Sequence, residues 1–321
     1  MAKTYFITGA QGCIGSWIVK ALVERGDVPV VFDRSEDASR LSAIIKQDDL
    51  SRVRFTVGDI TDKQAVLEAL KKAEAQHVIH LAGLQVPTCK VDPVTGALVN
   101  VVGTLNMFEA VKAVGVRGLV YASSAAVYGL NDDDSPLDES ADVAPSTHYG
   151  VFKRANEGNA KIYFLDHGIS SVGLRPLTVY GVNRDAGLTS DPTKAMKAAV
   201  LNRPFHIRFG GATDFQYVRD TAAAFIACAD QQPEGAFVFN LHGDAVAVSQ
   251  VAEIINSKAK AELATCGGPG IPVAPSMNDA AIRQVIRDLP VTPLESGIDE
   301  TMQMFALLRD EGRLDVRDLE V

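Results

Sequence analysis

Tyr149 and Lys153 stand four residues apart, a spacing that can place a phenol and an ammonium group side by side. On a helix, residues i and i+4 lie on one face. A phenol has an ordinary pKa of about 10, and lowering it to about 7 requires roughly 4 kcal/mol. A nearby ammonium and a cationic electron acceptor together supply stabilisation of that order in a partly dry site. The same spacing also occurs on ordinary helix faces, so the pair alone does not establish proton transfer.

Two adjacent serines supply a partner for such a base. Ser123 and Ser124 end a strand-like run at 118–123, and Ser124 precedes Tyr149 by 25 residues. In doubly wound α/β sheets, ligands bind at the carboxyl ends of the strands. We therefore expect Ser124 to hold a substrate oxygen while Tyr149 takes its proton and hydride leaves for a cofactor ring.

The segment TGAQGCIG places Gly9, Gly12 and Gly15 three residues apart, between the first strand-like run and the first helical one. Gly9 permits a tight turn, Gly12 lets the backbone approach a pyrophosphate, and Gly15 lets helix and strand pack closely. The helix amides and dipole then face the negative charge. Glycines gather in many turns without a ligand, but the strand–turn–helix context favours a dinucleotide site.

Asp33 ends the second strand 18 residues after Gly15. That is close to the spacing of about 20 expected for a carboxylate that binds the adenosine ribose. A carboxylate there repels a 2′-phosphate and favours NAD over NADP, although the neighbouring Arg34 could hold that phosphate. A helix N-cap or a surface turn is the alternative role for Asp33. Asp59, after the third strand, stands where a carboxylate could meet the adenine amino group, but Gly-Asp ends many strands.

The elements that must position these residues alternate along the first 125 residues. Strand-like runs occupy 4–8, 28–32, 53–58, 77–83 and 118–123, and helical runs occupy 13–25, 39–47, 62–75 and 92–114. Continuous apolar strands separated by helices indicate a parallel sheet covered on both faces. The predicted fold is α/β, a doubly wound Rossmann sheet with a smaller C-terminal substrate lobe. We expect 1–175 to form the cofactor domain, 213–243 to rejoin its sheet, and 176–321 to form mainly the lobe.

Composition excludes several classes of partner. The net charge is −9 without a cluster of Lys and Arg, which argues against nucleic acid and anionic membranes. No uninterrupted apolar run approaches the roughly 18 residues of a membrane span, and the N-terminus lacks signal-peptide architecture. Four scattered cysteines without Cys/His ligand spacing predict reduced thiols, no metal and a cytoplasmic protein. The acidic run at 131–134 is expected to be a solvated loop.

Together these motifs resemble the extended short-chain dehydrogenase/reductase family. The segments that carry the resemblance, in order, are TGAQGCIG, GDITD (58–62), HLAG (80–83), NVVGT (100–104), SSAAVYG (123–129), YGVFK (149–153) and LRP (174–176). The first half is most similar to sugar-nucleotide 4-epimerases. The resemblance implies a Rossmann domain, tightly bound NAD and a dimer in which helices near 92–114 and 148–168 form a four-helix bundle.

The resemblance also implies roles for single residues. Ser124, Tyr149 and Lys153 become the catalytic set, and Asn100 would steady the lysine through its backbone or a water. The expected cofactor contacts are Gly9, Gly12, Cys13, Ile14, Gly15, Asp33, Arg34, Asp59, Ile60, Leu81, Ala82, Gly83, Asn100, Ser123, Tyr149, Lys153, Pro176 and Val179. The expected substrate contacts are Gln85, Ser124, Ala125, Tyr149, Arg184, Thr189 and Ser190.

Two positions depart from the sugar-nucleotide enzymes of this family. Thr178 replaces an asparagine, and Thr213 replaces an arginine that reaches the diphosphate, so a charge-assisted contact is lost. Arg184, Arg208 or Arg219 could compensate from elsewhere, and neutral drift is the alternative explanation. Alanines after the serine pair, where dehydratases have an acidic pair, disfavour dehydration.

The segment 181–200 is the expected substrate-facing insert. Arg184 could clamp a carboxylate, and Thr189, Ser190 and Thr193 could meet hydroxyls. Ser190 or Asp191 could instead cap the following helix, with Pro192 in its first turn.

Three functions follow from the sequence. The first is an NAD-dependent dehydrogenase of a small polyhydroxylated substrate, a free sugar or sugar acid, which the two threonines favour. The alternative is a UDP-sugar 4-epimerase, which the first half favours. A non-catalytic NAD-binding regulatory protein is third, because such proteins commonly lose the tyrosine or the lysine, whereas this chain has both Tyr149 and Lys153.

Overall fold

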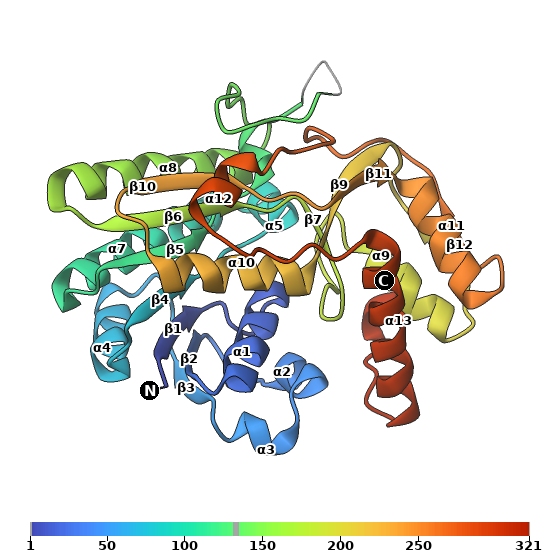
Figure 1. The fold of residues 1–321 in the computed structure, drawn as a ribbon, viewed down its shortest axis with the longest axis horizontal. Helices are drawn as coiled ribbons and strands as arrows, with labels where there is room; N and C mark the ends of the chain where they lie inside the picture. Colours follow the sequence, from blue (N-terminus) through green and yellow to red (C-terminus); the bar gives the residue numbers. More distant parts are fainter. Residues whose placement is uncertain (1, 131–134, 321) are drawn as a thin grey trace.

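The structure is a computed structural model that describes residues 2–130 and 135–320 (Figure 1). The run at 131–134, for which a solvated loop is predicted, lies outside the described residues.

A seven-stranded sheet forms the centre of the molecule, in the order β10-β6-β5-β4-β1-β2-β3. Its strands are β1 (Thr4–Thr8), β2 (Val28–Asp33), β3 (Arg54–Val57), β4 (His77–His80), β5 (Gly118–Ala122), β6 (Ser170–Arg175) and β10 (Ala236–Asn240). All neighbouring strands are parallel. The strand order reverses between β4 and β1, which creates the switch point at which doubly wound folds bind their ligands. The predicted α/β Rossmann fold is confirmed.

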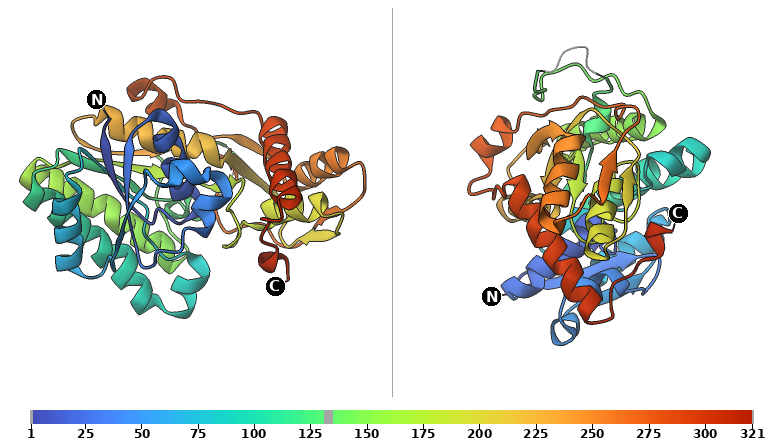
Figure 2. Two further views of the ribbon diagram at one scale, coloured as in Figure 1. Left: turned by 90° about the horizontal axis from the view of Figure 1, so that it is seen from below. Right: turned by 90° about the vertical axis from the view of Figure 1, so that its right-hand side faces the viewer.

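Helices cover both faces of this sheet (Figures 1 and 2). One face carries α1 (Cys13–Arg25) and α10 (Val218–Gln231), and the other carries α4 (Lys63–Ala73), α7 (Gly103–Val114) and α8 (His148–His167). Strands β4 and β6 are consequently buried at every residue. Burial on two faces explains why the strands are continuous apolar runs rather than alternating ones.

The lobe lies at one end of the sheet (Figure 1). It contains a three-stranded sheet, β11-β9-β7, and a two-stranded sheet, β12-β8. Its strands are β7 (Thr178–Tyr180), β8 (Phe205–Ile207), β9 (Ala212–Tyr217), β11 (Asp244–Ala247) and β12 (Ala264–Cys266). Its helices are α9 (Asp191–Val200), α11 (Val248–Ala259) and α13 (Leu294–Asp310). Apolar residues of α9, α10 and α13 belong to the same core cluster as those of α1, so the lobe packs firmly on the sheet.

Short helices complete the chain: α2 (Ser39–Ile44), α3 (Gln47–Leu50), α5 (Val86–Val91), α6 (Pro93–Ala97) and α12 (Ala280–Val285). A π-helical stretch, Leu98–Val102, joins α6 to α7. Within the described residues, the helical segment Pro93–Val114 is long and apolar enough to span a membrane by length and composition alone. Half of its most apolar window is buried inside the protein, as in a core helix of a globular fold.

Candidate active site

The glycine loop after β1 has the close packing that its sequence predicts. Gly9 has a φ of +67°, and a Cβ there would stand 2.6 Å from the backbone nitrogen of Ala82. A Cβ on Gly15 would stand 2.5 Å from the carbonyl oxygen of Gly9. Helix α1 begins after Gly12, and no side chain caps its first turn. Its amides therefore face the cleft at the place where a pyrophosphate would bind.

At the end of β2, Asp33 organises the neighbouring backbone. Its carboxylate accepts hydrogen bonds from the amides of Gln11, at 3.2 Å, and Arg34, at 2.8 Å. It does not cap a helix, because the N-cap position of α2 is Ala38. Asp59 accepts two bonds from Thr61, so the pKa of its carboxyl lies below the ordinary value.

Helix α8 brings the tyrosine and the lysine together over the end of β5. Thr147 caps the helix by accepting the amide of Gly150 at 3.1 Å. The Tyr149 phenol is hydrogen-bonded to the Ser124 hydroxyl. Lys153 is 5% exposed, and its ammonium lies 5.4 Å from the centre of the Tyr149 ring. That ammonium also donates to the backbone carbonyl of Ala122 at 2.7 Å.

Burial controls the acidity of both groups. It lowers the pKa of Lys153 to about 8 and raises the pKa of Tyr149 above its ordinary value. The hydrogen bond from Ser124 and the positive charge of Arg184 act against that rise in the pKa of Tyr149. In the protein alone the phenol is therefore protonated at neutral pH. The predicted lowering of its pKa requires the additional positive charge of the bound cofactor.

Asn100, in the π-helical stretch, lies behind the lysine. Its backbone carbonyl is occupied by Thr104, at 2.7 Å, and Asn156, at 2.8 Å. Its side-chain oxygen is buried without a hydrogen-bond partner. A Cβ built on Gly83 would lie 2.7 Å from that oxygen and 3.5 Å from the Lys153 nitrogen. Of the two predicted routes from Asn100 to Lys153, the structure thus leaves open a water held by the side chain, because the backbone carbonyl is used elsewhere.

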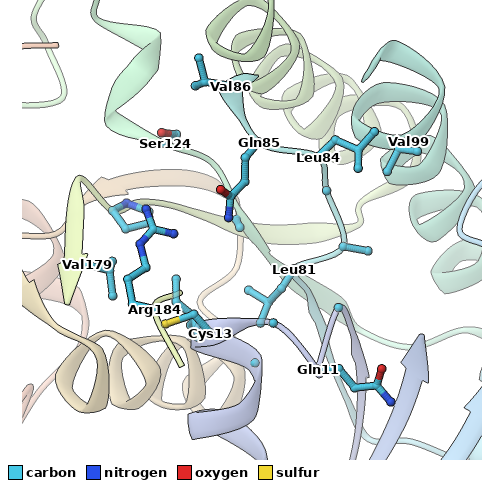
Figure 3. Close-up of a pocket in the computed structure, with 18 of the residues that line it drawn as sticks. Gln11, Cys13, Leu81, Leu84, Gln85, Val86, Val99, Ser124, Val179 and Arg184 are labelled. Atoms are coloured by element: carbon cyan, nitrogen blue, oxygen red, sulfur yellow. The ribbon is translucent and has the colours of Figure 1, made fainter. Parts of the chain in front are cut away.

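A cleft of about 700 Å³ joins the glycine loop to Ser124, Tyr149 and Lys153. Figure 3 shows part of its lining, from Gln11 and Cys13 to Ser124. Every residue expected to contact the cofactor or the substrate lines the cleft, except Asn100, Ser190 and Thr193. The residues that sequence reasoning missed include Gln11, Arg40, Asp185, Asp315 and Arg317. Gln11 stands inside the glycine motif and could have been found there. Asp185 stands beside Arg184 in the expected insert 181–200, whereas Arg40, Asp315 and Arg317 come from other segments and carry no motif.

Arg184 faces the end of the cleft that holds Ser124, Gln85 and Val179 (Figure 3). One of its terminal nitrogens donates to Thr189 at 3.0 Å, while its Nε is buried without a partner.

The helix cap expected at Ser190 is only partly present. Ser190 occupies the N-cap position of α9, and Pro192 stands in the first turn. The Ser190 hydroxyl, however, donates backwards to the carbonyl of Gly187 at 2.9 Å instead of capping. Thr193 accepts the amide of Gly181 at 3.2 Å, so it supports the loop that carries Arg184.

The two threonines that depart from the family pattern bond to each other. Their hydroxyl oxygens, on Thr178 and Thr213, lie 2.8 Å apart, and both residues are buried. Arg208 is committed to a two-point contact with Asp191, at 2.7 and 2.8 Å.

Arg219 contacts Glu300 at 2.8 Å, away from the cleft. Of the three arginines considered as replacements for the missing diphosphate contact, only Arg184 lines the cleft.

Arg40 connects the lobe to the glycine loop. It contacts both carboxylate oxygens of Asp185, at 2.7 and 3.0 Å, and donates to the backbone carbonyl of Gln11 at 3.0 Å. Asn183 donates to the carbonyl of Arg40 at 2.9 Å, and the indole of Trp17 donates to Val182 at 3.0 Å. The loop that follows β7 is thus fastened to the cofactor side of the cleft.

No group of three or more His, Cys, Asp or Glu that could hold a metal occurs among the described residues. The four cysteines are free thiols.

Comparisons with known proteins agree with this geometry. Residues 5–241 match the NAD dependent epimerase/dehydratase family. UDP-glucose 4-epimerase of Rhizobium meliloti is 30% identical over 274 residues, which cover 79% of this chain and 81% of that protein. UDP-glucuronate 4-epimerase 4 of Arabidopsis thaliana is 27% identical, over 94% of this chain and 75% of that protein.

Solved structures give the same result. The NAD complex of UDP-glucose 4-epimerase from Thermus thermophilus is 25% identical and has a TM-score of 0.81, covering 94% of this chain and 98% of that one. MoeE5 in complex with UDP-glucose and NAD is 26% identical and has a TM-score of 0.80, covering 96% of this chain and 99% of that one. The chain therefore belongs to the NAD-dependent epimerase/dehydratase family and is an NAD-dependent enzyme of the extended short-chain dehydrogenase/reductase type.

Proposed function

We propose that this protein is a 4-epimerase of a UDP-sugar, which oxidises one secondary alcohol and reduces the same carbon again, with NAD returned unchanged. The observation that carries the proposal is that Ser124, Tyr149 and Lys153 lie together at the carboxyl end of β5, with the Lys153 ammonium bonded to Ala122 and 5.4 Å from the Tyr149 ring. These residues line the same cleft as the glycine loop. The likeness to UDP-sugar 4-epimerases along most of the chain supports epimerisation over net oxidation.

In this proposal Ser124 holds the reacting oxygen and Tyr149 takes its proton. The Lys153 ammonium, 5.4 Å from the phenol ring, stabilises the phenolate as it forms. Bound NAD supplies the hydride acceptor and the positive charge that the buried phenol needs. Pro176 and Val179, which line the cleft, are the proposed neighbours of its ring.

At the substrate end, Arg184 is the proposed anion ligand. Its Nε has no partner in a buried position, and an unpaired buried donor is costly unless a ligand completes it. The guanidinium lines the cleft, and a planar carboxylate is the anion that it binds best. We therefore favour a substrate that carries a sugar carboxylate, with Thr189 and Gln85 as neighbours of its hydroxyls. The relatives include a UDP-glucuronate 4-epimerase, which agrees with this choice.

A second candidate is an NAD-dependent dehydrogenase of an unactivated sugar or sugar acid. The bond between Thr178 and Thr213 favours it, because those positions then offer no cation to a diphosphate. Arg208 is bound to Asp191 and therefore does not supply the missing cation. The third reading, a regulatory NAD-binding protein, is disfavoured because both Tyr149 and Lys153 are retained.

We also propose that NAD and the substrate bind to different parts of the chain, and that the protein is a dimer. Residues 1–175 with β10 would bind NAD, and most of 176–321 would bind the substrate. Apolar side chains are exposed on the helices from α5 to α8, which supports the expected four-helix bundle between two copies. They are Val91, Val94, Leu98, Val102, Val151, Ile162 and Leu165.

One experiment separates the two enzymatic candidates. Purified protein is incubated with NAD⁺ and a panel of sugars, sugar acids and UDP-sugars, and both NADH formation and isomerisation are followed. Conversion of a UDP-sugar without net NADH supports the epimerase. Net NADH from an unactivated sugar or acid would replace it with the dehydrogenase.

A further inference from the structure

Helix α8 contributes a third side chain to the end of β5. Tyr149 and Lys153 contact Ser124 and the carbonyl that precedes Ser123. Four residues further on, Glu157 accepts a hydrogen bond from the Ser123 hydroxyl at 2.6 Å. The spacing i, i+4, i+8 places all three side chains on one face of the helix. Three consecutive residues of the strand end are therefore held by three consecutive turns of α8.

Glu157 is a buried carboxylate that is paired with an arginine. It is 4% exposed, and Arg175 at the end of β6 contacts both of its oxygens, at 2.7 and 2.8 Å. Arg154 adds a longer contact of 3.3 Å from the solvent side. The remaining terminal nitrogen of Arg175 donates to the hydroxyl of Tyr128 at 2.5 Å. A charge pair this deeply buried persists only because each partner is fully satisfied.

This network holds the residue next to the substrate-binding serine. Ser124 is extended, with φ −167° and ψ 149°, and its hydroxyl accepts the amide of Ala126 at 3.2 Å. Glu157 holds the Ser123 hydroxyl, and one residue later the Ser124 hydroxyl meets Tyr149 of the same helix.

We propose that Glu157 is a positioning residue of the reaction, which holds Ser123 so that Ser124 faces Tyr149 and which balances the positive charge buried behind the phenol. This inference rests on the proposed role of Tyr149 as the base. The alternative is that the pair of Glu157 with Arg175 only ties α8 to β6. A purely structural tie would leave the titration of the phenol unchanged in Ser123→Ala, which breaks the bond to Glu157 and keeps every charge.

The charge provides the test. Eight residues of helix separate Glu157 from Tyr149 by about 12 Å, and a unit charge at that distance shifts a pKa by roughly one unit at an effective dielectric constant of about 20. Arg175 and Arg154 face Glu157. The groups that face the phenol are Arg184, Cys89 and Lys153. None of these is altered by Glu157→Gln, so the loss of one negative charge should lower the pKa of Tyr149.

The measurement is a spectrophotometric titration of tyrosinate in the NAD⁺-bound protein. The step that disappears in Tyr149→Phe belongs to the active-site phenol. We expect Glu157→Gln to move this step down by about one unit, and the double variant Glu157→Gln/Arg175→Gln to bring it back. Asp166→Asn, a charge change on the exposed side of the same helix, should leave it in place. An unmoved step in Glu157→Gln overturns the inference.

A milder variant covers the case in which Glu157→Gln does not fold. Ser123→Ala removes the bond to Glu157 without a change of charge. Ser124 then keeps its bond from the amide of Ala126, but its contact with Tyr149, which lowers the pKa of the phenol, weakens, so the step should rise. An unchanged step in Ser123→Ala contradicts the inference. Failure of the proposed function is distinct, since it would appear as a wild type that interconverts no UDP-sugar, a result on which the titration does not depend.

Discussion

Replacing Lys153 by methionine should stabilise the protein at neutral pH. Burial lowers the pKa of Lys153 from 10.5 to about 8, so the site disfavours the charged amine that catalysis needs. The unfolded chain then binds more protons than the native protein between these two values, and stability rises with pH across that window. The full difference corresponds to about 3 kcal/mol.

The sign and size of the stability difference follow from the pH at which the folded and unfolded states each lose the proton of Lys153. At about pH 7 both states hold the proton, and the native protein carries the whole penalty; by about pH 9.5 the native amine is neutral and about 2 kcal/mol has been recovered. Methionine has no proton to lose, and its substitution costs about 1 kcal/mol for the hydrogen bond to Ala122. Lys153→Met should therefore be more stable than wild type by about 1–2 kcal/mol at pH 7 and lose that advantage by pH 9.5.

Urea unfolding followed by the fluorescence of Trp17, the single tryptophan, measures this difference. Trp17 is buried in α1 and reports on the cofactor side of the molecule. Lys161→Met, on the exposed side of α8, is the matched control and should differ from wild type by less than about 0.5 kcal/mol at both pH values. The reasoning fails if the difference between Lys153→Met and wild type does not change with pH.

Three further predictions concern the cofactor and the substrate. Gly15→Ala should cost about 1–3 kcal/mol of stability, because its Cβ meets backbone at 2.5 Å, and thermal unfolding with and without NAD measures the loss; an unchanged melting temperature would contradict the predicted close packing. Asp185→Asn should speed NADH release about two- to fivefold, because its partly exposed contact with Arg40 fastens the lobe to the glycine loop; an equal release rate, followed by fluorescence, would show that the contact does not hold the cofactor. Arg184→Met should weaken binding of UDP-glucuronate by about 10- to 100-fold and leave UDP-glucose nearly unaffected. Equal losses for both ligands in calorimetry would remove the carboxylate from the proposal.

Local patterns predicted the parts of the site that lie within single elements. The shared face of Tyr149 and Lys153 follows from helical periodicity, and the close packing of Gly9 and Gly15 follows from the strand–turn–helix context. The first five of the seven parallel strands, β1 to β5, follow from continuous apolar runs between helices.

Local signals failed where tertiary packing decides the conformation. The helix expected at 39–47 is broken at Ile45, which is extended, so α2 and α3 are separate. The sequence pattern predicts no helix before residue 92, although Pro87 stands in the first turn of α5. The contact of Arg40 with Asp185 joins segments 145 residues apart, and no periodic pattern encodes it. The sequence indicated that Thr178 and Thr213 replace expected ligands, but not that they bond to each other.

Tyr149 is proposed to move a proton at a sugar carbon of a UDP-sugar. The most direct measurement is the rate of UDP-sugar interconversion by the NAD-bound wild type and by Tyr149→Phe, with binding of the same sugar measured in both. We predict that the wild type interconverts C4 epimers without net NADH, and that Tyr149→Phe binds the sugar normally but loses a factor of about 10²–10⁴ in rate. A variant that keeps the full rate, or a wild type that interconverts no UDP-sugar, would contradict the account.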